Sequence, residues 1–157
     1  MPTIEARLAR LGITLPEAAP PVANYVAFVL DRGTLVVSGQ LALGPDGKLD
    51  AAHKGKLGAG VSLEAGRAAA RNCAINVLAQ AKAALGDLER IERCLRLGGF
   101  INAAPEFTDL AVAMNGASDL MVEVLGDKGR HARSTVGVAS LPLGCAVEVE
   151  ALFSVRA

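Results

Sequence analysis

Hydrophobic and polar positions along the chain follow two periods, and each period predicts one kind of element. Apolar residues recur at helical spacing over three segments, 3–11, 62–86 and 106–125. Alternation every second residue predicts strands at 25–30, 35–43 and 91–101, with two more after residue 132. The glycine-rich segment 44–60 is expected to be a loop. This order predicts an α+β fold, with a mixed sheet and both long helices on one face.

The last two strands carry the most informative polar residues. The alternating runs are separated by the sequence Leu-Pro-Leu-Gly at 141–144, which predicts a β-hairpin or two adjacent strands joined by a short loop. Arg133 lies in the first run, and Glu148 and Glu150 lie in the second, on one face of their strand. An arginine and a carboxylate on neighbouring strands, inside otherwise apolar β structure, predict a binding site.

Each of these residues has a functional and a purely structural interpretation. The planar guanidinium of Arg133 matches a carboxylate or phosphate with two parallel hydrogen bonds, whereas a strand-end arginine can also pair with a surface carboxylate. A glutamate on a buried face can orient water or relay a proton with a raised pKa, whereas a solvated edge strand gives it no such role. The alternation alone leaves both interpretations open.

Length, charge and cysteine content narrow the class of protein. A chain of 157 residues is expected to form one domain, 1–157, in which 1–21 is an N-terminal extension with a short helix. Sixteen basic residues cancel sixteen acidic ones, which argues against nucleic acid as a partner. Three cysteines without a CxxC pair, no signal peptide and no apolar run of membrane-spanning length predict a soluble, cytoplasmic protein without a membrane partner.

The remaining candidates are weaker. His53 and His131 are the only histidines, and neither has metal-ligand spacing to a second ligand, so no metal is expected. His131 lies two residues before Arg133, where it either borders the site or occupies an exposed turn. The segment 55–62 precedes a helix and is either an anion cradle or, more simply, a connector.

Several motifs resemble the YjgF/RidA family, the reactive-intermediate deaminases also labelled L-PSP endoribonucleases. Ser38-Gly39-Gln40 resembles that family's Ser-Gly-Gln strand, Tyr25 stands where the family often has a site tyrosine, and Asn115 stands where it carries an asparagine. The C-terminal signature is matched at the same internal spacing by Ala132-Arg133-Ser134, Leu141-Pro142 and 147–151. The resemblance covers residues 22 to 156. Thr135 replaces the cysteine of many deaminase members, and the long 44–60 loop is typical of a longer branch.

This resemblance implies a chorismate-mutase-like fold and a homotrimer with clefts between subunits. It implies hydrolysis of enamines and imines, such as 2-aminoacrylate and 2-iminopropanoate, to a 2-keto acid and ammonia without a cofactor. Arg133 would hold the substrate carboxylate and Glu148 would position the attacking water. The residues lining the cleft would be Tyr25, Ser38, Gly39, Asn115 and Thr135. A non-catalytic protein that binds small carboxylates is the alternative, and a ribonuclease ranks third.

Overall fold

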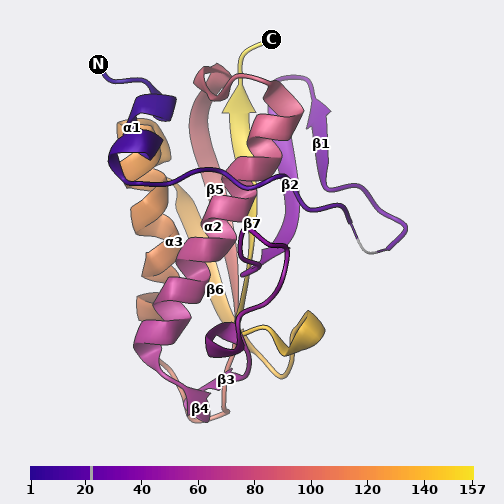
Figure 1. Ribbon diagram of the computed structural model, residues 1–157, viewed down its shortest axis with the longest axis vertical. Coiled ribbons are helices and arrows are strands. Elements are labelled where there is room, and N and C mark those ends of the chain that lie inside the picture. Colours follow the sequence, from indigo (N-terminus) through magenta and orange to yellow (C-terminus); the bar gives the residue numbers. More distant parts are fainter. Residues whose placement is uncertain (22) are drawn as a thin grey trace.

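Two long helices lie side by side across one face of a five-stranded sheet (Figure 1). The computed structural model describes residues 1–21 and 23–157. The helices are α1 (Ile4–Arg10), α2 (Leu63–Leu85) and α3 (Leu110–Leu125). The strands are β1 (Phe28–Asp31), β2 (Thr34–Leu41), β3 (Lys56–Leu57), β4 (Gly60–Val61), β5 (Ile91–Asn102), β6 (Ala132–Val138) and β7 (Val147–Val155). The predicted α+β fold, with both long helices on one face of a mixed sheet, is confirmed.

The predicted helix starts are explained by their capping residues. The Thr3 hydroxyl accepts a hydrogen bond from the Ala6 amide at the start of α1, and the Ser62 hydroxyl accepts one from Ala65 at the start of α2. Segment 55–62 leads into α2 and contains the short parallel strands β3 and β4. Small residues then allow α2 and α3 to approach closely, since a side chain at Gly116 would overlap the Arg67 carbonyl.

Strand order corrects the prediction for the two terminal strands. The sheet runs β1-β2-β7-β5-β6, so β5 lies between β6 and β7. β6 is parallel to β5 and β7 is antiparallel to it. The helix α3 carries the chain from β5 to the far edge of the sheet, and β7 then returns to the other side of β5. The hairpin prediction and the adjacent-strand prediction are therefore both wrong.

The two faces of the sheet differ in what covers them. On β7 the residues Val147, Val149 and Ala151 are buried in the core, and the intervening glutamates point to the opposite face. On β6, Arg133 and Thr135 pair with the buried residues Leu97 and Gly99 of β5. Met114 of α3 lies directly over Gly99, so this side of β6 faces the helices.

Two predicted boundaries and one predicted loop change for local reasons. β1 begins at Phe28 rather than at residue 25. α3 begins at Leu110 rather than at 106, because Phe107 closes a turn onto the Ala104 carbonyl and packs against Gly58 instead of joining the helix. The 44–60 segment is mainly loop, with a 3-10 turn and the two-residue strand β3 inside it. Ile4 and Leu8 of α1 are buried in the core, so the N-terminal extension packs onto the domain.

Candidate functional site

Arg133 is held from the side of α3 by three neutral acceptors. Its Nη1 donates to Asn115 Oδ1 at 2.9 Å and to Ser118 Oγ at 3.1 Å, and its Nη2 donates to the Ala111 carbonyl at 3.2 Å. All three acceptors belong to α3, and Asn115 and Ser118 are one helical turn apart on one face. The guanidinium is thus fixed in direction while its full positive charge is retained.

No carboxylate neutralises Arg133 within residues 1–21 and 23–157, because none lies within salt-bridge distance of it. In the same part of the chain its Nε makes no hydrogen bond. Two residues along β6, the Thr135 hydroxyl is buried without a partner among these residues. A half-buried cation with unused donors beside an unpaired hydroxyl is suited to a planar anion such as a carboxylate.

His131 and Ser118 extend this arrangement beyond the predicted residues. Ser118 Oγ lies 2.8 Å from His131 Nε2, and His131 Nδ1 lies 2.5 Å from the Gly129 carbonyl. Burial lowers the pKa of His131, and the positive charge of Arg133 lowers it further. The half-buried His131 therefore borders the site. Sequence reasoning missed Ser118, although its place three residues after Asn115 on the same helix was a usable signal. Together Arg133, Asn115, Ser118, His131 and Thr135 form what we call the anchoring cluster.

Glu148 lies on the opposite face of the sheet, against Gly39 of β2. A side chain at Gly39 would overlap the Glu148 carboxylate, so only glycine allows the carboxylate to rest on the β2 backbone. Burial raises the pKa of Glu148, and the nearby charge of Glu150 raises it further. The half-buried carboxyl is thereby brought closer to the range of a general base at neutral pH.

Ser38 and Tyr25 are linked to Gly39, the residue on which this glutamate rests. The Ser38 hydroxyl donates to the Val26 carbonyl at 2.7 Å, which connects β2 to the segment that carries Tyr25. Tyr25 is about half exposed and lines, with Gly39, a small cavity of about 70 Å³. Tyr25, Ser38, Gly39 and Glu148 are called the glutamate cluster below.

A bulge in β2 gives the Ser-Gly-Gln sequence its shape. The pairing of β2 with β7 shifts register between Val37 and Gln40, at Ser38 and Gly39. The buried Gln40 amide donates to the Ser38 carbonyl at 3.0 Å, and Gln80 of α2 donates to Gln40 at 3.3 Å. Gln40 therefore supports the bulge from the core, whereas Ser38 bonds Val26 and Gly39 lies against Glu148.

The predicted site residues thus fall into two groups that cannot meet within one chain. β6 and β7 are separated by β5, which places them about 10 Å apart, or two strand spacings. In addition, Arg133 faces the helices and Glu148 faces the other side of the sheet. The expectation of a site on neighbouring strands is corrected: the candidate residues form two separate groups, the anchoring cluster and the glutamate cluster.

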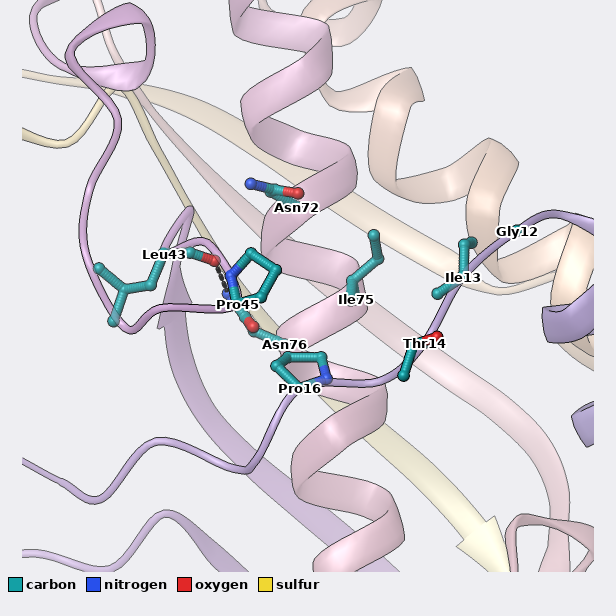
Figure 2. A pocket seen from close by; sticks show the side chains of 9 residues that line it. All are labelled: Gly12, Ile13, Thr14, Pro16, Leu43, Pro45, Asn72, Ile75 and Asn76. Carbon is teal, nitrogen blue, oxygen red and sulfur yellow. Dashed lines mark hydrogen bonds between the residues drawn. The ribbon is translucent and has the colours of Figure 1, made fainter.

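A larger cavity lies away from both clusters. It has a volume of about 300 Å³ and lies between the N-terminal extension, the start of the 44–60 loop and α2 (Figure 2). The side-chain nitrogen of Asn76, on α2, donates to the carbonyls of Leu41 and Leu43 at 2.9 Å each, so both of its N–H groups are paired. None of the predicted site residues lines this cavity.

The cysteines and the acidic residues suggest no further chemistry. Cys73, Cys94 and Cys145 are free and buried. Burial raises the pKa of Cys73 well above its ordinary value and that of Cys94 to about 12, which disfavours a reactive thiolate. Among residues 1–21 and 23–157 no group of three potential metal ligands comes together, and no helix in those segments is long and apolar enough to cross a membrane.

Comparison with known proteins gives consistent matches. Residues 5–154 match the model of the family described as YjgF/chorismate mutase-like, a description that also carries an endoribonuclease label. Protein TCP17 of Trypanosoma cruzi is 50% identical over 150 residues, covering 95% of this chain and 92% of that protein.

Solved structures show the same similarity. The crystal structure of Atu1372 from Agrobacterium tumefaciens, a protein of unknown function, has a TM-score of 0.90 and 46% identity, over 98% of this chain and 92% of that one. TdcF of E. coli, crystallised with bound serine, shares the fold at a TM-score of 0.64 and 24% identity, over 90% of this chain and 94% of that one.

Proposed function

The chain belongs to the YjgF/RidA family, and from this premise we propose that it hydrolyses small 2-imino and 2-enamino carboxylates to 2-keto acids and ammonia. The observation that carries the proposal is Arg133, a cation fixed by three neutral acceptors with donors left for a ligand. A charge-assisted bond of this kind is worth roughly 1.5–3 kcal/mol, enough to orient a three-carbon acid. The serine bound to TdcF also carries a carboxylate, which agrees with an anion anchor in this fold.

Glu148 supplies the proton chemistry in this proposal. An imine carbon is already electrophilic, so hydrolysis requires a positioned water and a group that carries both protons of that water to the nitrogen. Glu148 accepts one proton as the water oxygen bonds to C2 and passes it to the imine nitrogen, which gives a carbinolamine. It then accepts the proton of the C2 hydroxyl and passes it to the amine as the C–N bond breaks, which releases the 2-keto acid and ammonia. The raised pKa of Glu148 suits both steps, and such acid–base catalysis contributes about 10²–10⁴-fold. The Tyr25 and Ser38 hydroxyls would line the same cleft.

A homotrimer with clefts between subunits forms the second part of the proposal. Because Arg133 and Glu148 face opposite sides of one sheet, a single small substrate can touch both only if they come from different copies. A ring in which the β6 edge of one copy meets the β2–β7 face of the next would complete each site, and heterologous contacts of this kind close into rings. Exposed valines on the glutamate face support its burial by another copy: Val29, Val36 and Val136 are 49%, 40% and 48% exposed.

Complementation between two inactive variants tests activity and assembly together. We expect Arg133→Ala and Glu148→Gln each to abolish accelerated pyruvate release from enzymatically generated 2-aminoacrylate. In randomly mixed rings, about one cleft in four has an intact Arg133 from one subunit and an intact Glu148 from its neighbour. Co-expression of the two variants should therefore restore about one quarter of the wild-type rate. Tagged copies confirm that hybrids form. Hybrids without activity would exclude shared clefts, and a wild type no faster than the uncatalysed reaction would exclude the hydrolase.

Binding of a carboxylate metabolite without turnover is the second candidate. It is favoured by Thr135, which stands where related deaminases carry a cysteine. Its buried hydroxyl has no partner among residues 1–21 and 23–157 and offers a hydrogen bond rather than a nucleophile. Thermal stabilisation by 2-keto acids or amino acids, lost in Arg133→Ala and without imine turnover, would support it. Fast imine hydrolysis would exclude it.

A further inference from the structure

Ser118 and His131 form, with Arg133, a chain of hydrogen bonds whose directions follow from chemistry. The Gly129 carbonyl can only accept, so His131 Nδ1, at 2.5 Å, carries the proton. In the neutral imidazole Nε2 then has a lone pair, so the Ser118 hydroxyl donates to it across 2.8 Å. The Ser118 oxygen accepts from Arg133 Nη1 at 3.1 Å, because a guanidinium only donates.

We infer that Ser118 and His131 are positioning residues, with His131 in its Nδ1–H tautomer orienting the Ser118 hydroxyl so that Ser118 holds the Arg133 guanidinium ready for a carboxylate. The inference rests on the proposed function, since it assigns a role within the anchoring cluster of the proposed site. Neither residue touches the substrate.

This role has a physical reason in the flexibility of arginine. Ordering a free arginine side chain on binding costs up to about 2 kcal/mol of rotamer entropy, and an anchor fixed in advance avoids that cost. Ser118 alone could rotate its hydroxyl toward other acceptors. The lone pair of His131 removes that freedom and directs the oxygen lone pairs toward Arg133. A carboxylate in the place of Ser118 would fix Arg133 equally well, but it would compete with the ligand for the positive charge of the guanidinium.

Nitrogen NMR of the imidazole tests the bond directions without any substrate. His53 is the only other histidine, so His53→Gln identifies the His131 signals. Wild-type protein at neutral pH should show a protonated Nδ1 and an unprotonated, hydrogen-bonded Nε2. The Nε2 resonance should shift in Ser118→Ala, because its donor is removed. A protonated Nε2 in the wild type, or an Nε2 resonance unchanged in Ser118→Ala, would overturn the inference.

Kinetics separates positioning from general structural damage. Ser118→Ala should raise KM for the imine about 5–10-fold with kcat changed less than about twofold, as for lost ground-state binding. Ser118→Thr, which keeps the hydroxyl, should restore KM, and the exposed Ser140→Ala is the matched control. A fall in kcat at constant KM, or failure of the threonine variant to restore KM, would overturn the inference.

The same variants show whether the hydrolase proposal or the positioning role of Ser118 has failed. If the wild type binds pyruvate but does not turn over imines, the hydrolase proposal fails, and the dissociation constant of pyruvate measured by calorimetry replaces KM in the comparison. A 5–10-fold weaker binding by Ser118→Ala would then support positioning, and equal binding would exclude it. Loss of both turnover and pyruvate binding in the wild type would overturn both proposals.

Discussion

Arg133 and Glu148 are held in contrasting ways on the two faces of one sheet. The anchoring cluster is a network in which neutral hydrogen bonds fix the cation and support comes from α3 and from the turn before β6. In the glutamate cluster the Glu148 carboxylate occupies the room left by the missing side chain of Gly39, in a β-bulge, and burial raises its pKa. The first arrangement keeps a charge and fixes its direction, as the proposed binding of a carboxylate requires. The second makes a charge easier to neutralise, as the proposed proton transfer requires.

The largest expected effect separates the two glutamates of β7. Glu148→Gln should lower kcat/KM for 2-iminopropanoate by about 10²–10⁴-fold, because it removes the proposed proton acceptor. Glu150→Gln is the matched control on the same face, and it should change kcat/KM less than about threefold. Pyruvate formation measures both. Equal losses in the two variants would contradict the assignment of Glu148.

A second comparison tests whether the missing side chain of a glycine positions each glutamate. Gly39 and Gly98 each lie against one glutamate, Gly39 against Glu148 and Gly98 against Glu150. Gly39→Ala should displace the Glu148 carboxylate and lower turnover by about 10²-fold. Gly98→Ala should displace Glu150 and mainly lower thermal stability. Circular dichroism melting curves and turnover of both variants measure this contrast, and it would be refuted if Gly98→Ala were the less active of the two.

In the anchoring cluster the expected effect is smaller and affects binding. Asn115→Ala removes one of several hydrogen bonds to Arg133, so KM should rise about 5–10-fold while kcat stays within about twofold. Asn72→Ala on α2, outside both clusters, is the control. Steady-state kinetics distinguishes the outcomes. A selective fall in kcat would mean that Asn115 acts on the transition state rather than on the anchor.

The smallest effect is a contrast in the pH dependence of stability. Because the pKa of Glu148 is raised, its contribution to stability is present at acid pH and is lost as the pH rises through the folded-state pKa. The Tm of Glu148→Gln relative to wild type should therefore be about 1–3 °C higher at pH 7.5 than at pH 4.5.

His131 is expected to show the opposite sign. Its lowered pKa means that stability is lost as pH falls below about 6.5, the ordinary value. The Tm of His131→Gln relative to wild type should therefore be higher at pH 5 than at pH 7.5 by about 1–3 °C. Calorimetric Tm values across this range check both signs. Parallel pH profiles for the two variants would contradict the contrast.

Sequence reasoning predicted the local features well, for identifiable reasons. Thr3 and Ser62 marked helix starts because capping is a contact within one turn. The start of α3 was misplaced because Phe107 packs onto Gly58, a residue distant in sequence. Ser118 and the hydrogen-bond partners of His131 and Gln40 were not predicted, since each depends on a partner from another element.

The sequence by itself determined the family, the order of long elements and the residues that carry polar chemistry, because periodicity, caps and motif spacing are local. Only the tertiary structure decided that β5 lies between the two terminal strands and that Arg133 and Glu148 face opposite sides of the sheet. Alternation reveals which residues of a strand share a face, but the partner of each strand is chosen by long-range packing of the helices and the sheet. That choice separates the predicted site residues into two clusters on opposite faces of the sheet.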